Sequence, residues 1–370
     1  MIIFIGFSLV YIGFLWWSRF HWNRISVQAP PEPKKLTFSI IIPVRNEAEN
    51  ISQILSDLEN QQYPKDQFEV ILVDDHSEDS TLKMALQYLG QSNIQYQVVS
   101  LFDFGLTGKK QAITKGVERA NFEIILSTDG DCHLPASWIQ SYSKMYSIGD
   151  YQMVAGPVKM CADNFFTRIQ AIEFAGLVGI GASSLQSGNP GMCNGANLSY
   201  KKSAFNLVNG YEGNFQVPSG DDEFLLQKIF KLYPESVGYL KDKEGIVETS
   251  AKPTFGELIS QRLRWSSKWK YHKSSYIKAM AVLLFSNYIS ELVALGLVLS
   301  GVYRPELFIV IFALRWMTLY QFGVPIGRFF DHKSLFWYTL IIEIIYPFFV
   351  VFLGLASIFG HYSWKGRSYT

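Results

Sequence analysis

Polar residues collect at three places where predicted strands end. They are Asn46 and Glu47 after the first apolar run, Asp74 and Asp75 after the second, and Asp129-Gly130-Asp131 after a later one. In an open α/β sheet, ligands bind beyond the carboxyl ends of the strands. Asp129 and Asp131 offer hard oxygen ligands that suit Mg²⁺ or Mn²⁺ bridging a diphosphate. An ordinary Asp-Gly turn would explain the same three residues.

A second group of carboxylates opens a helical pattern after Gly220. Asp221, Asp222 and Glu223 are consecutive there. Helix capping is one interpretation, because anions near a helix N-terminus stabilise it by about 0.3–1 kcal/mol. A general base is the other, since crowded like charges raise the pKa of one member. Asp75 has a similar alternative: it could hydrogen-bond a base or ribose, whereas Asp74 could cap the next helix.

Further along, the segment Gln261-Arg262-Leu263-Arg264-Trp265 precedes an apolar stretch. Basic residues at the flank of a membrane span explain Arg262 and Arg264 without any catalysis, but they do not explain the pattern Gln-x-x-Arg-Trp. No GxGxxG follows the first strand and no GxxxxGK[ST] is present, which argues against dinucleotide and P-loop nucleotide sites.

Alternating strands and helices must position these residues. Strands are predicted at Phe38–Ile42, Phe68–Val73, Gln95–Ser100 and Phe122–Leu126. Helical patterns begin near Asn50, Ser80 and Lys110 between them. Because continuous apolar strands alternate with helices, the sequence predicts an α/β fold with a mostly parallel sheet.

The composition indicates that part of the chain lies in lipid. Hydrophobic residues make up 48% of the 370, whereas charged residues make up 18%, below the roughly 25% usual for soluble domains. Four apolar stretches are long enough for membrane spans: Ile2–Trp17, Ala279–Val302, Glu306–Val324 and Leu335–Phe359. A cleaved signal peptide is the alternative for the first, although no Lys or Arg precedes it. The net charge of +1 favours no nucleic-acid partner.

These stretches divide the chain into an anchor at residues 1–18, a Pro-rich linker at 19–36, a domain at 37–275 and membrane helices at 279–362. Basic residues beside the first, second and third spans place the domain in the cytoplasm, whereas Lys365 and Arg367 weaken that orientation. The segment Asn164–Ser184 is amphipathic and is interpreted as an interfacial helix, with a buried core helix as the alternative.

Three ionisable residues lie inside the predicted spans and need partners there. Arg315 is expected to pair with Glu291 or Glu343. The pairs are either contacts between helices or a polar lining for a lipid head group or a growing chain. Cys132, Cys161 and Cys193 lack CxxC spacing and are interpreted as plain thiols.

The order and spacing of these pieces resemble the membrane-bound branch of glycosyltransferase family 2, enzymes of the GT-A fold. The resemblance covers about residues 37–275. It rests on Pro43, Asn46, Glu47, Asp75, Gly108-Lys109, Asp129-Gly130-Asp131, Gly195, Asn197, Asp221-Asp222 and Gln261 to Trp265. The Gln-x-x-Arg-Trp motif is similar to that of ceramide glucosyltransferases, poly-N-acetylglucosamine synthases and cellulose, chitin and hyaluronan synthases. Asp221 departs from the family pattern, which has Glu at that position.

The resemblance implies a role for each matching residue. Asp222 is the implied general base, and Arg264 neutralises the leaving diphosphate, with Gln261 and Trp265 completing the catalytic set. Asp131 is the implied ligand of Mg²⁺ or Mn²⁺, together with Asp129. The resemblance also implies that the following residues bind the substrate: Pro43, Glu47, Asp75, Lys109, Asp129, Asn197, Asp221 and Arg262.

The same resemblance implies an inverting glycosyl transfer. The donor is a nucleotide sugar, expected to be a UDP-sugar, and the acceptor is a hydroxyl group of a membrane lipid. Three carboxy-terminal spans are too few for a long polysaccharide channel, which favours the lipid acceptor. The alternative is a short processive synthase of the poly-N-acetylglucosamine kind, whose members can be nearly this small. A non-catalytic scaffold is the alternative from another class. The expected location is a bacterial inner membrane, with several spans and a cytoplasmic catalytic domain.

Overall fold

The computed structural model describes residues 1–26, 34–217, 219–271, 274–359, 362–364 and 367–369. The chain divides into two compact units. The sheet unit comprises residues 25–161 and 185–250, and the helical unit comprises residues 1–24, 162–184 and 251–370. Residues 162–184 and 251–275, assigned above to the domain at 37–275, therefore group with the membrane helices. Residues 27–33 of the predicted linker, and Lys365, lie outside the described residues.

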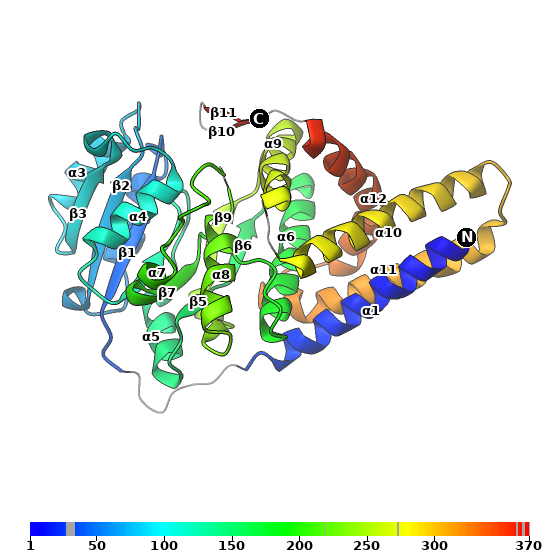
Figure 1. Ribbon diagram of the computed structural model, residues 1–370, viewed down its shortest axis with the longest axis horizontal. Coiled ribbons are helices and arrows are strands. Elements are labelled where there is room, and N and C mark those ends of the chain that lie inside the picture. Colours follow the sequence, from blue (N-terminus) through cyan, green and yellow to red (C-terminus); the bar gives the residue numbers. More distant parts are fainter. Residues whose placement is uncertain (27–33, 218, 272–273, 360–361, 365–366, 370) are drawn as a thin grey trace. The chain divides into compact units, whose positions relative to one another are not determined.

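A seven-stranded sheet in the order β3-β2-β1-β4-β7-β5-β8 forms the centre of the sheet unit (Figure 1). Its strands are β1 Phe38–Val44, β2 Phe68–Asp74, β3 Gln95–Ser100, β4 Ile124–Ser127, β5 Met153–Ala155, β7 Leu198–Lys201 and β8 Val237–Tyr239. β7 runs antiparallel to both of its neighbours, and the other pairings are parallel. The mostly parallel α/β fold predicted from the sequence is confirmed.

Helices and a small second sheet complete the sheet unit. The helices are α2 Ile51–Glu59, α3 Thr81–Leu89, α4 Lys109–Arg119, α5 Trp138–Ile148, α7 Lys202–Leu207 and α8 Asp221–Leu232, with short 3₁₀ turns at Lys65–Gln67, Leu101–Phe104 and Lys243–Gly245. β6 Val158–Cys161 pairs with β9 Val247–Ser250. Six of the seven residues of β1 are buried, as expected for a parallel strand covered on both faces.

Pro43 lies in β1 without disturbing the sheet. The carbonyl of Ile41 accepts from Thr128 on the β4 side, and pairing between β1 and β4 ends at Ile41 and Ser127. Because residues two apart along a strand point to the same neighbour, the missing N–H of Pro43 faces the side where β4 has already ended. Proline therefore costs no ladder hydrogen bond there, and the strand continues to Val44.

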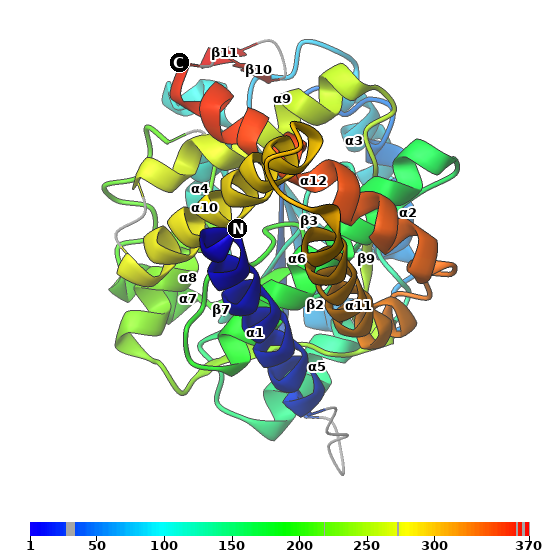
Figure 2. The same cartoon turned by 90° about the vertical axis from the view of Figure 1, so that its right-hand side faces the viewer.

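Four long helices form a bundle in the helical unit: α1 Ile2–Arg24, α10 Ser275–Leu299, α11 Pro305–Phe329 and α12 Leu335–Phe359 (Figure 1 and Figure 2). α1 packs on α10 and α11, and α12 packs on the same two helices. α6 Phe165–Gln186, α9 Phe255–Ser266, the 3₁₀ turn Ser267–Tyr271, and a hairpin of β10 Tyr362–Trp364 and β11 Arg367–Tyr369 belong to the same unit. All four predicted spans are thus long helices, and α12 has the bounds expected.

Five helices in the described part of the chain are long and apolar enough to cross a membrane, which indicates a multi-pass membrane protein. The fifth is α6, the segment interpreted above as interfacial. Half of its apolar window is buried. Glu173 of α6 accepts a hydrogen bond from Tyr346 of α12 at 3.1 Å, and Gly179 packs against Ile326 of α11. α6 is therefore also a packed element of the bundle.

A buried arginine joins three helices of the bundle. Arg315 of α11 is fully buried, and its Nη2 lies 2.8 Å from Glu291 of α10 while its Nε donates to Glu343 of α12 at 2.9 Å. The guanidinium also lies over the rings of Tyr11 at 4.8 Å and Phe4 at 5.7 Å, both from α1. The prediction of a pair with either glutamate is confirmed for both, and all four long helices meet at this cluster.

Candidate active site

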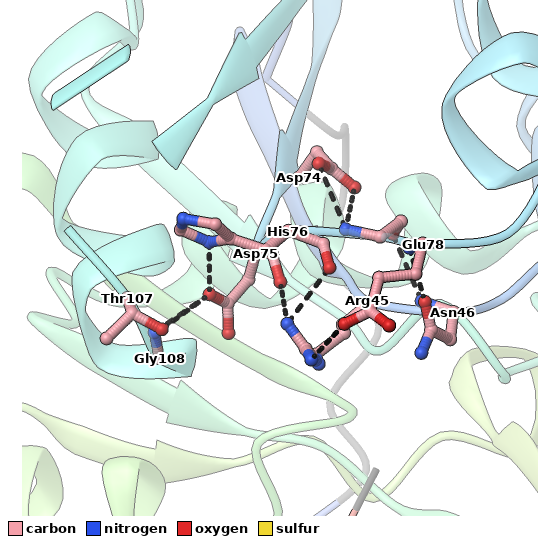
Figure 3. Close-up of polar contacts among 9 residues, drawn as sticks. Arg45, Asn46, Asp74, Asp75, His76, Glu78, Thr107 and Gly108 are labelled. Atoms are coloured by element: carbon pink, nitrogen blue, oxygen red, sulfur yellow. Dashed lines mark hydrogen bonds and ion pairs between the residues drawn. The ribbon is translucent and has the colours of Figure 1, made fainter. Parts of the chain in front are cut away.

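The loops that follow β1 and β2 are tied together by Arg45. Its Nη1 donates to the backbone carbonyls of Asp75 and His76 at 2.8 and 2.9 Å, and its Nη2 pairs with Glu78 at 3.2 Å (Figure 3). Asn46 adds a second tie because its Oδ1 accepts from the N–H of Glu78 at 2.8 Å. Sequence reasoning did not single out Arg45, since its partners lie 30 or more residues away along the chain.

Asp75 is held against the loop that precedes α4. Its Oδ1 accepts from Thr107 Oγ1 at 3.1 Å and from the N–H of Gly108 at 3.0 Å, and it lies 3.3 Å from Nδ1 of His76 (Figure 3). The carboxylate is therefore fixed at the carboxyl end of the sheet by groups from a different loop. Thr107 is a further residue that the motif search missed.

Asp74 does not cap the following helix, the role considered for it above, and instead caps a turn. Both carboxylate oxygens lie 3.3 Å from the N–H of Ser77 (Figure 3). The helix itself starts later, at Thr81, where Asp79 accepts from the Thr81 N–H at 2.9 Å. The two adjacent aspartates thus contact different loops.

The Asp129-Gly130-Asp131 turn packs directly on Glu47. A Cβ at Gly130 would lie 3.0 Å from Cγ1 of Val44 and 3.2 Å from Cγ of Glu47, so a side chain there would need its neighbours to shift. Glu47 is buried, and its Oε2 accepts from Asn50 at 2.8 Å. Glycine between the two aspartates therefore allows the turn to approach the first loop closely.

Lys109 connects two carboxylates that are far apart in sequence. Its Nζ lies 2.6 Å from Asp129 and 3.2 Å from Asp221 at the start of α8. Burial by itself would lower the pKa of Lys109, but Asp129 and Asp221 raise it well above its ordinary value. Burial would likewise raise the pKa of Asp221, whereas Lys109 and Lys110 hold it below its ordinary value. The strand end and α8 thus share one charged cluster.

Asp222 is next to this cluster and is oriented by backbone N–H groups. Its Oδ2 accepts from Gly195 at 3.1 Å and its Oδ1 from Glu223 at 2.8 Å. A Cβ at Gly195 would lie 3.0 Å from Oδ2 of Asp221 and 3.6 Å from Cβ of Asp222. Glycine 195 therefore brings the loop before β7 against both aspartates, which the sequence alone did not place together.

Asn197 has a purely internal set of partners. The side chain is fully buried, and its Oδ1 accepts from Trp138 and Tyr142 at 2.9 and 2.8 Å. Its Nδ2 donates to the carbonyls of Pro157 and Gly245 at 2.7 and 2.9 Å. These contacts use the hydrogen-bonding capacity of the amide, so Asn197 holds β7, α5 and two loops together and is not carried into the proposed substrate site.

The Gln261–Trp265 segment lies on α9, in the helical unit. Arg262 pairs with Glu173 of α6, and its guanidinium lies 4.3 Å from the centre of the Trp265 ring. Trp265 also meets Phe174 of α6, with ring centres 6.0 Å apart. Gln261 and Arg264 are partly exposed on the same helix. Arg262 and Trp265 therefore anchor α9 to α6.

Comparisons with known proteins agree with this architecture. Residues 124–358 match the family described as glycosyl transferase family group 2, and residues 39–208 match glycosyl transferase family 2. The chain belongs to glycosyltransferase family 2.

Individual relatives of this family 2 chain are distant. Glycosyltransferase AglE of Haloferax volcanii is 33% identical over 36% of this chain and 43% of its own length. A poly-beta-1,6-N-acetyl-D-glucosamine synthase of Staphylococcus epidermidis is 23% identical over 66% of this chain and 57% of its own. The chain thus spans about half the length of these relatives.

One solved structure has a similar fold over nearly the whole chain. It is a mannosyltransferase of Pyrobaculum calidifontis in complex with GDP-Man and Mn²⁺. The similarity has a TM-score of 0.62 at 17% identity and covers 92% of this chain and 98% of that one.

The carboxylates at this site of the family 2 chain suit a divalent metal whose remaining ligands come from the substrate. No group of three or more His, Cys, Asp or Glu side chains is arranged for a metal in the ranges that the structure describes. Mg²⁺, however, is commonly held by one or two carboxylates together with substrate phosphates and water. Asp129 and Asp131 are two such carboxylates, both partly exposed at the end of β4. One of them, Asp129, already contacts Lys109.

Lys110 is a further residue that sequence reasoning missed. It is buried, and its Nζ donates to the carbonyls of Asn214, Val217 and Ser219 at 2.9, 2.6 and 3.0 Å. These residues precede Asp221. A lysine beside Lys109 in a glycine-containing loop was the only sequence signal, and it does not distinguish a structural lysine from a ligand contact.

We expect Lys110→Met to loosen the segment before α8, because three carbonyls would lose their donor. A loss of about 1–3 kcal/mol in the free energy of unfolding is typical when buried partners are left unsatisfied. Hydrogen exchange should be faster at Asn214, Val217 and Ser219. The control is Lys115→Met on the same helix, where the lysine pairs with the exposed Glu118. Equal exchange in the two variants would contradict this role.

The cluster of Lys109 and Asp221 predicts a specific pH dependence. The lowered pKa of Asp221 contributes stability that is present above the ordinary Asp value of about 3.9 and is lost as the pH falls through the folded value. The raised pKa of Lys109 contributes stability that is present below about 10.4 and is lost only as the pH rises through the folded value.

The difference in melting temperature between wild type and Lys109→Met should therefore be constant from about pH 5 to 9 and shrink below about pH 4. Thermal unfolding followed at each pH measures it. A difference that closes near neutral pH would show that the pair is not charged as described.

Proposed function

We propose that the chain transfers a sugar from a nucleotide-sugar donor, a UDP-sugar by preference, to a hydroxyl group of a membrane lipid, with inversion at the anomeric carbon. The observation that carries the proposal is the cluster at the carboxyl end of the sheet. There Asp129, Lys109 and Asp221 form one charged network beside Asp222. Family membership supports the reaction class, and the five apolar helices support a lipid acceptor.

On the donor side, Glu47, Asp75 and Lys109 surround the strand ends where a nucleotide would bind. Asp129 and Asp131 would hold Mg²⁺ or Mn²⁺, which supplies positive charge against the diphosphate when bound. Lys109 contributes a permanent cation beside Asp129, and Asp221 keeps that cation in place. A guanidinium such as that of Arg264 suits phosphate through bidentate geometry.

On the acceptor side, Asp222 acts as the general base. It takes the proton of the acceptor hydroxyl, whose oxygen forms the new bond to the anomeric carbon as the bond to the diphosphate oxygen breaks. The nucleoside diphosphate leaves with the bonding electron pair. The N–H groups of Gly195 and Glu223 aim the carboxylate, since each oxygen accepts one of them.

The test is to supply membranes containing the chain with labelled UDP-sugars and GDP-sugars and to separate the products by size and by extraction into organic solvent. We expect a labelled lipid bearing one sugar. High-mass material that stays in the aqueous phase would favour the processive alternative, for which the similarity to a poly-N-acetylglucosamine synthase is the supporting observation. No product from any donor would favour a non-catalytic scaffold.

We also propose that the sheet unit faces the cytoplasm, as the basic flanks predict. Lys83 on α3 and Arg304, which precedes α11, are both exposed. A cysteine at position 304 should react with a membrane-impermeant maleimide in intact cells, whereas one at position 83 should react only after lysis. The unsubstituted chain, with its three native cysteines, is the control. The reverse pattern would invert the orientation.

A further inference from the structure

A cavity of about 590 Å³ lies inside the helical unit, among α1, α6, α10, α11 and α12. Most of its lining is aliphatic or aromatic, as at Phe285, Phe322 and Leu353. Its volume is in the range of small-molecule binding sites. The five helices around it are those long and apolar enough to cross a membrane, so the cavity lies in the part of the chain that membrane lipid would surround.

The lining of the cavity follows α12 over most of that helix. It extends from Leu335 to Ser357, which corresponds to about 33 Å at 1.5 Å per residue. This length is close to the roughly 30 Å of a bilayer's hydrocarbon core.

The acidic groups that line the cavity are already paired with arginines. Glu343 accepts from Arg315, and Glu173 pairs with Arg262 and accepts from Tyr346. The lining therefore presents little uncompensated charge to an occupant. A growing glycan needs hydrogen-bonding partners along its whole length, whereas a hydrocarbon chain needs none. The chemistry of the lining favours the hydrocarbon chain.

One part of the cavity is continuous with the Gln261–Trp265 helix. Ser266, the residue after Trp265, belongs to the lining, and so does Glu173, which holds Arg262. Ser266, Glu173 and Tyr346 give this part of the cavity polar groups, as Glu343, Tyr11 and Tyr288 do beside Arg315. An amphipathic molecule with its chain along α12 would have its polar head beside α9.

We propose that this cavity binds one hydrocarbon chain of the lipid acceptor and presents the acceptor's head group at α9. This inference rests on the proposed function for the identity of the occupant. It adds the location of the chain and a set of residues that select for chain length, none of which belongs to the carboxylate cluster of the sheet unit.

Gly176 allows the cavity to be filled without disturbing its wall. It lines the cavity on α6, and a Cβ added there meets no atom within 4 Å. Gly296 on α10 is a matched control: a Cβ there also meets nothing within 4 Å, and this glycine is not part of the lining. Both lie inside helices, where leucine has the higher helix propensity, so neither Gly176→Leu nor Gly296→Leu should weaken its helix.

In detergent or nanodiscs, we expect Gly176→Leu to lower kcat/KM for a long-chain acceptor by about tenfold, which corresponds to about 1.4 kcal/mol. Transfer to a short-chain, water-soluble analogue of the same acceptor should be unchanged. Gly296→Leu should behave as wild type with both acceptors. Equal activity of the two variants on the long-chain acceptor, or an equal loss on both acceptors in Gly176→Leu, would overturn the proposal.

A second measurement does not depend on turnover. The full-length protein is placed in phosphatidylcholine vesicles containing a diacylglycerol with a diazirine at the end of one acyl chain, irradiated, and mapped by mass spectrometry. We expect labelling of Phe322 and Ile326, which line the cavity and are 2% and 1% exposed, and loss of that label in Gly176→Leu. Labelling confined to outward-facing residues such as Val293 would overturn the cavity assignment.

The two proposals can fail separately. If wild type makes only an aqueous polymer while Phe322 and Ile326 are labelled, the cavity binds lipid and the proposed acceptor is wrong. If wild type glycosylates a lipid while these residues are not labelled and Gly176→Leu is fully active, the acceptor is right and the cavity assignment is wrong.

Discussion

Asp222→Asn should reduce turnover by about 100- to 10,000-fold, the usual contribution of a general base, while nucleotide binding is largely retained. The charged network of Lys109, Asp129 and Asp221 stays complete in this variant. Asparagine also keeps one acceptor oxygen for the N–H of Gly195 or Glu223. Initial rates with saturating donor, together with calorimetric titration of the nucleoside diphosphate, measure the two effects separately.

Two neighbouring carboxylates are the controls for this assignment. Asp221→Asn removes a partner of Lys109. It should therefore weaken nucleotide binding more than it lowers the turnover rate at saturating donor. Glu223→Gln changes a buried residue in the same turn of α8 and should retain most of the turnover. If Glu223→Gln abolishes turnover while Asp222→Asn is active, the general base is Glu223 and the register of the resemblance is wrong by one residue.

Arg315→Leu should lower the free energy of unfolding of the helical unit by about 3–5 kcal/mol. The substitution leaves Glu291 and Glu343 buried without their cation, and an uncompensated charge in the interior is costly. It also removes the contacts of the guanidinium with Tyr11 and Phe4 of α1. Unfolding in mixed detergent micelles, followed by tryptophan fluorescence, measures the change.

Arg304→Gln is the matched control because Arg304 is exposed at the start of α11. Its effect should stay within about 0.5 kcal/mol. Adding Glu291→Gln and Glu343→Gln to Arg315→Leu should recover much of the lost stability, since the buried charges are then gone. A small effect of Arg315→Leu alone, with no recovery in the triple variant, would show that the ion cluster contributes little to the bundle.

Hydrophobic patterns in the sequence predicted the strands and helices well where the pattern fits only one kind of surroundings. Continuous apolar runs became buried parallel strands, and β1 begins at Phe38 as expected. α12 has the predicted bounds because its sequence from Leu335 to Phe359 is strongly apolar, with Glu343 as its one charged residue. The α6 segment was harder, since an amphipathic pattern fits both a membrane interface and a packed helix, and only contacts with α11 and α12 showed the packing.

The candidate site was predictable as a set of residues, but their connections were not. Asp75, Lys109, Asp129 and Asp222 were all named from motifs. Arg45, Thr107 and Lys110 were missed because each acts through a partner that is distant along the chain: the hydrogen bonds of Lys110 span 104 to 109 residues. Asn197 was assigned to substrate, whereas its amide is used by four internal partners.

The sequence by itself determined the fold class, the four long apolar helices near the two ends and the chemical types at the strand ends, because these depend on hydrophobic periodicity and on residues adjacent in the chain. The tertiary structure decided which charges meet. Lys109 meets Asp129 because parallel strands end at one edge, and it meets Asp221 because α8 begins there; Arg315 lies between two glutamates because helices pack side by side. Contacts between residues that are far apart in the sequence depend on chain topology, and local sequence patterns do not predict them.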